Sequence, residues 1–174
     1  MDVNSAAFQA YFPAVIPDLA ATTLTGLRMD IPNFYNSAQS QASGSTETNY
    51  LFNFGTAPSA FRAAIDSALL ATSSTLSADD IVARAQTQSC AGCHRLSNNA
   101  PLGGGLIWPP SLGFTHVSER DIDLEVVAGV TRYKISPALE TTLLPRRKFV
   151  LDDYINNPPP NANSNKSIGG STTH

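Results

Sequence analysis

The sequence is poor in charged side chains. Lys, Arg, Asp and Glu make up 14 % of its 174 residues, against about a quarter in ordinary soluble domains. Ser, Thr, Asn and Gln take their place, a surface composition commoner in secreted proteins than in cytosolic ones. The formal net charge of −3 and the pI near 5.5 argue against nucleic acid as a partner, because nucleic-acid binding needs clustered Lys and Arg.

Long apolar runs are also absent. The nearest, 102–112, is broken by glycines and prolines and is too short to cross a bilayer, so we expect no membrane span. The first residues, Met1–Asn4, have no basic start and no apolar stretch follows them, so they do not form a signal peptide. For an exported protein we expect the leader to lie upstream of Met1.

Cysteine is limited to two residues, which excludes a disulfide framework. Cys90 and Cys93 stand two residues apart and His94 follows directly, which is the attachment signature of a c-type haem. Each thiol adds to one of two neighbouring vinyl groups, and the two intervening residues span the gap between them. His94 is thereby carried beneath the porphyrin, where it can bind the iron.

Three other interpretations of this motif compete with haem. A disulfide between Cys90 and Cys93 would leave His94 unexplained. A thioredoxin-like dithiol requires a strand–helix context near the motif, whereas a helix is predicted to end there. A zinc ion would need two further ligands, and His116 and His174 are the only other histidines. Covalent haem c accounts for the whole motif and is favoured over all three.

Two helices are predicted before the motif. One lies near 58–71, with Pro58 in its first turn and an apolar face behind it. The next begins at Ser77, whose hydroxyl can cap the helix while Asp80 occupies the reciprocal capping-box position. This second helix leads directly into Cys90.

Two more helices are predicted after the motif. One would span 118–129, although its valines leave a strand open. The last would start near Pro145, turn Phe149 and Ile155 inward, and end before Pro158.

These signals divide the chain into three parts. Residues 1–75 are predicted to be an irregular N-terminal extension with the single helix near 58–71. Residues 76–157 would form the haem domain, and 158–174 a flexible polar tail. The expected fold class is mainly α.

A family resemblance strengthens the prediction over about residues 77–157. The helix entering Cys-x-x-Cys-His, the Pro-Pro-Ser-Leu-Gly loop at 109–113 and a closing helix ending in Asp-Asp-Tyr-Ile resemble class I cytochrome c. This resemblance implies a cytochrome c-like helical domain around one haem. The stretch from Arg84 through the motif to Glu119 is also similar to haem-motif segments that end certain exported bacterial proteins, which implies a periplasmic or extracellular location.

The sixth iron ligand has to be sought separately. Class I cytochromes usually place a Met between the last two helices, but 130–144 contains none. His116 is the preferred candidate, because it follows a Gly/Pro-rich loop long enough to wrap the haem edge. Met29 is the next candidate, and an open position is the third. Trp108 is a candidate for packing on the porphyrin or donating to a propionate.

The expected function is electron transfer by one covalently bound haem c, ligated by His94 and His116. The alternatives are a haem enzyme or gas sensor with an open distal site, and a structural cytochrome subunit of an extracellular assembly. A carrier is favoured over an enzyme. The expected partner is a redox protein or a neighbouring haem, and self-assembly is a further possibility.

Overall fold

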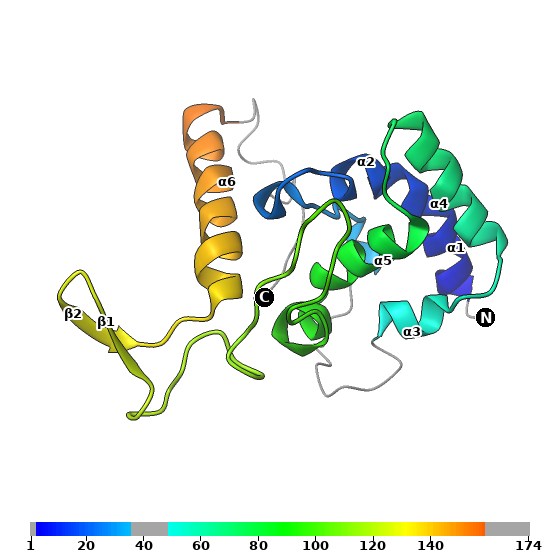
Figure 1. Cartoon of the computed structure of the whole chain (residues 1–174). Helices are drawn as coiled ribbons and strands as arrows, with labels where there is room; N and C mark the ends of the chain where they lie inside the picture. The colour runs from blue at the N-terminus through cyan, green and yellow to red at the C-terminus, as the bar shows by residue number, and fades with distance from the viewer. Residues whose placement is uncertain (1–2, 36–48, 159–174) are drawn as a thin grey trace.

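The computed structural model describes residues 3–35 and 49–158. Helices α1 to α5 gather on one side of the molecule, with α6 and the β1–β2 hairpin on the other (Figure 1). The α-helices and strands are α1 (Val3–Tyr11), α2 (Ile16–Leu19), α3 (Tyr50–Phe54), α4 (Ala60–Ala71), α5 (Ala78–Thr87), β1 (Leu124–Val127), β2 (Val130–Tyr133) and α6 (Leu144–Asn156). Short 3₁₀ turns are η1 (Phe12–Val15), η2 (Leu24–Gly26) and η3 (Asn33–Tyr35), and π-helical turns are η5 (Gly92–Leu96) and η6 (Ala138–Leu143).

Local capping explains where α4 and α5 begin. The Ser59 hydroxyl accepts a hydrogen bond from the amide of Arg62 and starts α4. At α5, Ser77 Oγ accepts from the Asp80 amide at 3.1 Å, and the Asp80 carboxylate accepts from the Ser77 amide at 2.8 Å. Both helices predicted before the motif are therefore confirmed, the first starting two residues later than expected.

The main core joins the N-terminal segment to α4 and α5. Its buried side chains are Phe12, Val15, Ile16, Leu19, Met29, Ile65, Leu69, Ala78, Ile81, Val82 and Ala85. The prediction of an irregular N-terminal extension is therefore wrong, because that segment is helical and supplies about half of this core. Pro13 and Pro17 each sit at the start of a separate short helix. The resulting helices, η1 and α2, are too short to show a 3.6-residue period in the sequence.

A hairpin replaces the helix predicted at 118–129. Strands β1 and β2 pair antiparallel, with Val127 opposite Val130. Ala128 and Gly129 between them both have positive φ, 51° and 81°, as a tight hairpin turn requires. The β-branched residues and this turn favour the hairpin over the helix. The prediction of a mainly α fold, with a cytochrome c-like helical domain, is therefore wrong.

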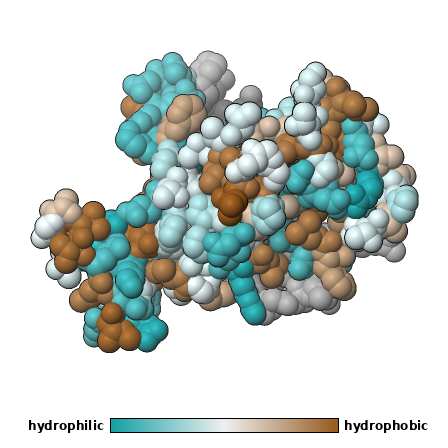
Figure 2. Space-filling view, in the orientation of Figure 1, coloured by the Kyte–Doolittle hydropathy of each residue, from teal (hydrophilic) through white to brown (hydrophobic). Residues whose placement is uncertain are grey.

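One face of the hairpin carries charged side chains that pair with each other and with η6. Arg132 of β2 donates to Glu125 of β1 at 2.9 Å and also to Glu140 of η6. Leu124 and Val126 are 46 % and 69 % exposed on the other side. Figure 2 accordingly shows apolar side chains on the surface of the projecting hairpin.

Helix α6 lies close to its predicted position but does not bury the expected face. Phe149 and Ile155 are 69 % and 64 % exposed, and no residue of α6 is fully buried by the described chain.

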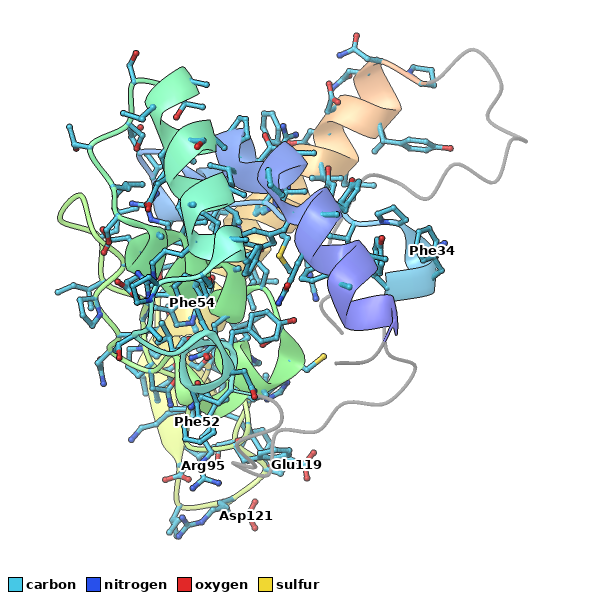
Figure 3. All side chains as sticks on the ribbon, turned by 90° about the vertical axis from the view of Figure 1, so that its right-hand side faces the viewer. Phe34, Phe52, Phe54, Arg95, Glu119 and Asp121 are labelled. Carbon is cyan, nitrogen blue, oxygen red and sulfur yellow. The ribbon has the colours of Figure 1, made fainter. Side chains whose placement is uncertain are left out.

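Exposed aromatics also occur elsewhere, and Figure 3 shows Phe34 well separated from Phe52, so these two rings do not form one patch. None of the described helices is long and apolar enough to span a membrane. The predicted tail, apart from Pro158, lies outside the described residues.

A buried arginine ties three segments together. The Arg84 side chain is 1 % exposed, and among the described residues its guanidinium donates to four backbone carbonyls. These are Leu102 O at 2.6 Å, Leu19 O at 2.8 Å, Ala21 O at 2.8 Å and Gly103 O at 3.1 Å. Burial lowers the pKa of Arg84, while nearby Asp80 opposes that shift. The guanidinium therefore holds the N-terminal segment and the loop after the motif against α5.

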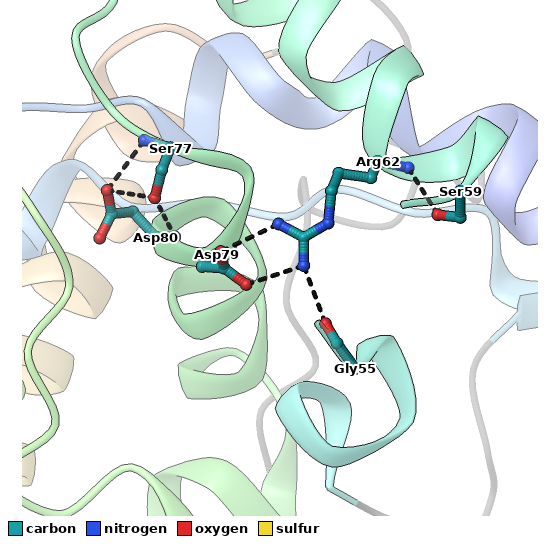
Figure 4. A network of polar contacts seen from close by, with 6 residues as sticks. All are labelled: Gly55, Ser59, Arg62, Ser77, Asp79 and Asp80. Atoms are coloured by element: carbon teal, nitrogen blue, oxygen red, sulfur yellow. Dashed lines mark hydrogen bonds and ion pairs between the residues drawn. The ribbon is translucent and has the colours of Figure 1, made fainter. Parts of the chain in front are cut away.

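A second arginine ties α3, α4 and α5 together at the surface (Figure 4). Arg62 of α4 donates to both carboxylate oxygens of Asp79 in α5, at 2.9 and 3.1 Å, and to Gly55 O at 2.8 Å. The pKa of Asp79 is held below its usual value, mainly by this hydrogen bond from Arg62.

We expect Arg84→Met to lower the free energy of unfolding by about 2–4 kcal/mol, because buried carbonyls lose their donors. Urea unfolding of the purified protein measures this. Arg120→Met is the matched control, since the Arg120 side chain is 70 % exposed and its loss should cost less than about 0.5 kcal/mol. Equal losses for the two variants would contradict the role assigned to Arg84.

The Arg62–Asp79 pair should make stability depend on pH. The pKa of Asp79 is lower in the folded state, so the pair contributes above the unfolded-state pKa of about 3.9 and is lost as pH falls through the folded-state value. We expect Asp79→Asn to be less stable than wild type at pH 7, and the two to converge as pH falls below the folded-state pKa of Asp79. The difference should be under about 1 kcal/mol, because the carboxylate is largely exposed, and should shrink in about 1 M salt. Urea unfolding across pH would refute this if the gap were constant.

Candidate functional site

Helix α5 delivers the chain into the motif through a tight turn. Ser89 Oγ donates to Gln86 O at 2.7 Å and accepts from the Gly92 amide at 3.0 Å. The Cys93 amide then donates to Ser89 O at 2.9 Å, and η5 follows. A Cβ on Gly92 would lie 1.7 Å from Gln86 O, so only glycine fits between the two cysteines at this point.

The two cysteines have different surroundings. Cys90 is half-buried. Burial raises the pKa of Tyr50 in α3, and the nearby Cys90 adds to that rise. Cys93 is buried in a second cluster with Leu27, Ala83, Leu102 and Trp108. Burial raises the pKa of Cys93 to about 11, with Cys90 adding to the rise. At neutral pH the Cys93 thiol therefore carries its proton.

Two buried polar atoms close to the motif lack partners. Trp108 is 1 % exposed, and its Nε1–H finds no acceptor within the described part of the chain. Ser97, which follows η5, is also 1 % exposed, and its hydroxyl is unpaired among the described residues. Unsatisfied buried donors are costly, so Trp108 offers a hydrogen bond from inside the cluster that holds Cys93.

His94 and His116 stand at the two ends of a loop, and the fold brings their rings together. Their ring centroids lie 4.5 Å apart. His94 Nδ1 is 2.6 Å from the carbonyl of Phe114, and His116 Nδ1 is 2.8 Å from Ser136 Oγ. His116 Nε2 lies 3.4 Å from Cys93 Sγ. The motif and His116 thus form one compact group.

Polar contacts within the loop fix this arrangement. Asn98 accepts from the Ser111 amide at 2.9 Å and donates to Ser111 Oγ at 2.9 Å. Ser111 Oγ lies 2.6 Å from His94 O. Further along, the Ser136 amide donates to His116 O at 2.7 Å. The Ser111 bonds hold one end of the 111–116 segment against the motif and Asn98. The Ser136 bond holds the other end, at His116.

The electrostatics keep His116 neutral. Burial, together with the charges of His94 and Arg147, lowers its pKa to about 4. Arg147 of α6 also opposes the rise in the pKa of Cys93, so its guanidinium lies near both side chains. A neutral imidazole is the form that binds a metal.

The other candidates are placed away from this group or outside the described residues. Met29 is 5 % exposed and packs in the main core. His174 lies outside the described residues.

Sequence reasoning did not find three contributors to the site. Ser136 and the Phe114 carbonyl hold the histidine rings, and Arg147 supplies a nearby positive charge. A backbone carbonyl has no residue-type signal, and Ser136 is distant in sequence from the motif. Only the fold brings these groups together.

Comparison with known proteins gives no relative: no family model, curated protein or solved structure matches the chain. Across residues 3–35 and 49–158, no group of three or more His, Cys, Asp and Glu side chains is arranged to hold a metal ion.

We expect Gly92→Ala to destabilise the protein by about 3 kcal/mol, because the added methyl group meets backbone that must shift. Gly105→Ala is the matched control: nothing lies within 4 Å of its Cβ, but its φ is +79°, so strain alone should cost about 1–2 kcal/mol. Thermal and urea unfolding compare the two. An equal or smaller loss at Gly92 would show that the motif turn tolerates a side chain.

Proposed function

We propose that this protein is a monohaem c-type cytochrome that transfers electrons. Cys90 and Cys93 would attach the haem covalently, and His94 and His116 would bind its iron. The observation that carries the proposal is the pairing of the motif histidine with His116, ring centroids 4.5 Å apart, beside Cys93.

The hydrogen bonds of the two rings support the same assignment. In each histidine Nδ1 is engaged by the protein, with Phe114 O in one case and Ser136 Oγ in the other. A ligating histidine usually donates its second ring N–H to such an acceptor, which fixes the tautomer and leaves Nε2 for the metal. The Phe114 carbonyl can only accept, so His94 has the polarity that an iron ligand needs, and Ser136 Oγ can accept from His116 Nδ1–H in the same way.

The surroundings of Cys93 fit a porphyrin. Leu27, Leu102 and Trp108 provide apolar surface beside the thiol, and the unpaired Trp108 N–H can serve a propionate. Arg147 adds a nearby positive charge. Buried carboxylates need such partners.

The rings of His94 and His116 are in contact in this structure, so they must separate for a group to enter between them. That separation would require the segment between Ser111 and His116 to shift, and this segment lies at the surface. Phe114 is 59 % exposed, and Gly113 has a φ of +76° with open space around it.

The bound haem would supply a one-electron iron centre, whose potential depends strongly on its axial ligands. Two imidazoles held by the protein would favour electron transfer, because both coordination positions would be taken. The expected electron partner is a redox protein or the haem of a neighbouring copy. The low charge content and the attachment motif support a periplasmic or extracellular location.

Carbon monoxide distinguishes a carrier from an open-site enzyme or sensor. We expect the ferrous, haem-loaded protein to show a six-coordinate low-spin spectrum and to bind carbon monoxide slowly or not at all. His116→Ala should bind it rapidly, because one coordination position becomes free. Absorption spectra with and without the gas measure this.

Met29→Leu is the matched control and should leave spectrum and gas binding unchanged, since Met29 packs in the main core. Rapid binding by the wild-type protein would overturn the bis-histidine assignment. Retention of the haem by Cys90→Ser/Cys93→Ser after extraction with acidified organic solvent would overturn covalent attachment.

A further inference from the structure

Helix α6 carries an apolar stripe that no described element covers. Leu144, Leu151 and Ile155 are 44 %, 55 % and 64 % exposed, and Lys148 stands between the first two. These four residues are three or four positions apart along the chain, so their side chains lie along one side of the helix. Figure 1 shows α6 at the edge of the molecule, away from α1, α4 and α5.

The other side of α6 rests on the body of the protein. Arg146, Val150 and Tyr154 are partly buried, and Arg146 donates to Thr25 O of η2 at 3.2 Å. These contacts hold the helix so that the apolar stripe faces outward.

The charged residues divide α6 into a basic half and an acidic half. Arg146, Arg147 and Lys148 come first, and Asp152 and Asp153 follow near the end of the helix. Acidic side chains near a helix C-terminus oppose the helix dipole, and the last turn of α6 holds no basic residue. This order of charges therefore does not stabilise the isolated helix.

The ion pair beside the stripe can take further partners. Lys148 Nζ contacts Asp152 Oδ2 one turn along the helix, and the two side chains are 75 % and 50 % exposed. A lysine that precedes its acid at this spacing is the less favourable order. An exposed pair of this kind contributes little by itself and more within a network of charges.

We propose that α6 is a docking surface for a second copy of this chain, bound antiparallel about a two-fold axis near Val150. A two-fold interface brings the same patch of both copies together, so the patch must complement itself. A helix with one basic and one acidic half meets this condition when it is reversed. The two helix dipoles then also oppose each other.

The antiparallel arrangement matches the side chains of the stripe. Leu144 of one copy lies opposite Ile155 of the second copy, at both ends of the contact. Lys148 of each copy lies opposite Asp152 of the other, so four charges of alternating sign flank the apolar contact. The aliphatic stem of Lys148 covers Leu151 while its ammonium group stays in water. This inference does not depend on the bound haem.

The size of the contact sets the expected strength. The 13 residues of α6 span about 20 Å, which is less surface than permanent dimers use. We expect a reversible dimer with a dissociation constant on the order of 10–100 µM. Sedimentation equilibrium of the purified full chain measures it, and a wild-type chain that stays monomeric at about 300 µM would overturn the proposal.

Exchanging the charges tests the antiparallel register. Lys148→Glu makes all four charges at the contact negative, and Asp152→Lys makes all four positive, so each variant alone should dimerise more than about 10-fold more weakly than wild type. An equal mixture of the two variants should form a heterodimer, because one copy then carries only acids and the other only lysines. A fold defect cannot produce this rescue. A mixture that stays monomeric, or either variant dimerising as wild type does, would contradict the register.

A second pair of variants tests the stripe without changing any charge. Leu151→Gln should weaken the dimer about 10-fold or more, because it places an amide in the apolar contact. Phe149→Gln is the matched control: Phe149 is 69 % exposed on the same helix but lies off the stripe, so its loss should leave the dissociation constant unchanged. Equal weakening by both variants would refute the stripe as the docking surface.

Discussion

The hydrogen bonds from the Arg84 guanidinium to backbone carbonyls are the interaction on which most of the described fold depends. The guanidinium occupies the interior of the molecule and satisfies carbonyls of two segments packed against α5, among them Leu19 O and Leu102 O. A buried charge is tolerated only with such partners. Because Leu102 also belongs to the cluster around Cys93, the same side chain that closes the main core positions the apolar wall beside the motif.

The candidate site is built from two parts of the chain. The motif is fixed to α5 by the Ser89 turn and by the close approach at Gly92. His116 reaches it from an exposed loop and is held by Ser136.

Local chemistry made α4 and α5 predictable from the sequence. A serine cap and a capping box act within a few residues of the helix start. Ser77 and Asp80 therefore predict the start of α5 without any tertiary information. The hairpin was missed because the φ values at Ala128 and Gly129, not the apolar spacing, decide between helix and turn. The exposed face of α6 was missed because amphipathic spacing cannot show that nothing in the described chain covers it.

The sequence by itself determined the Cys-x-x-Cys-His motif, because the spacing of Cys90, Cys93 and His94 is a property of five consecutive residues. It also indicated His116, but only as one of three histidines. The tertiary structure decided that His116, and not Met29, lies beside the motif. It also decided which groups hold the two rings, since the Phe114 carbonyl and Ser136 meet them only when distant segments of the chain fold together.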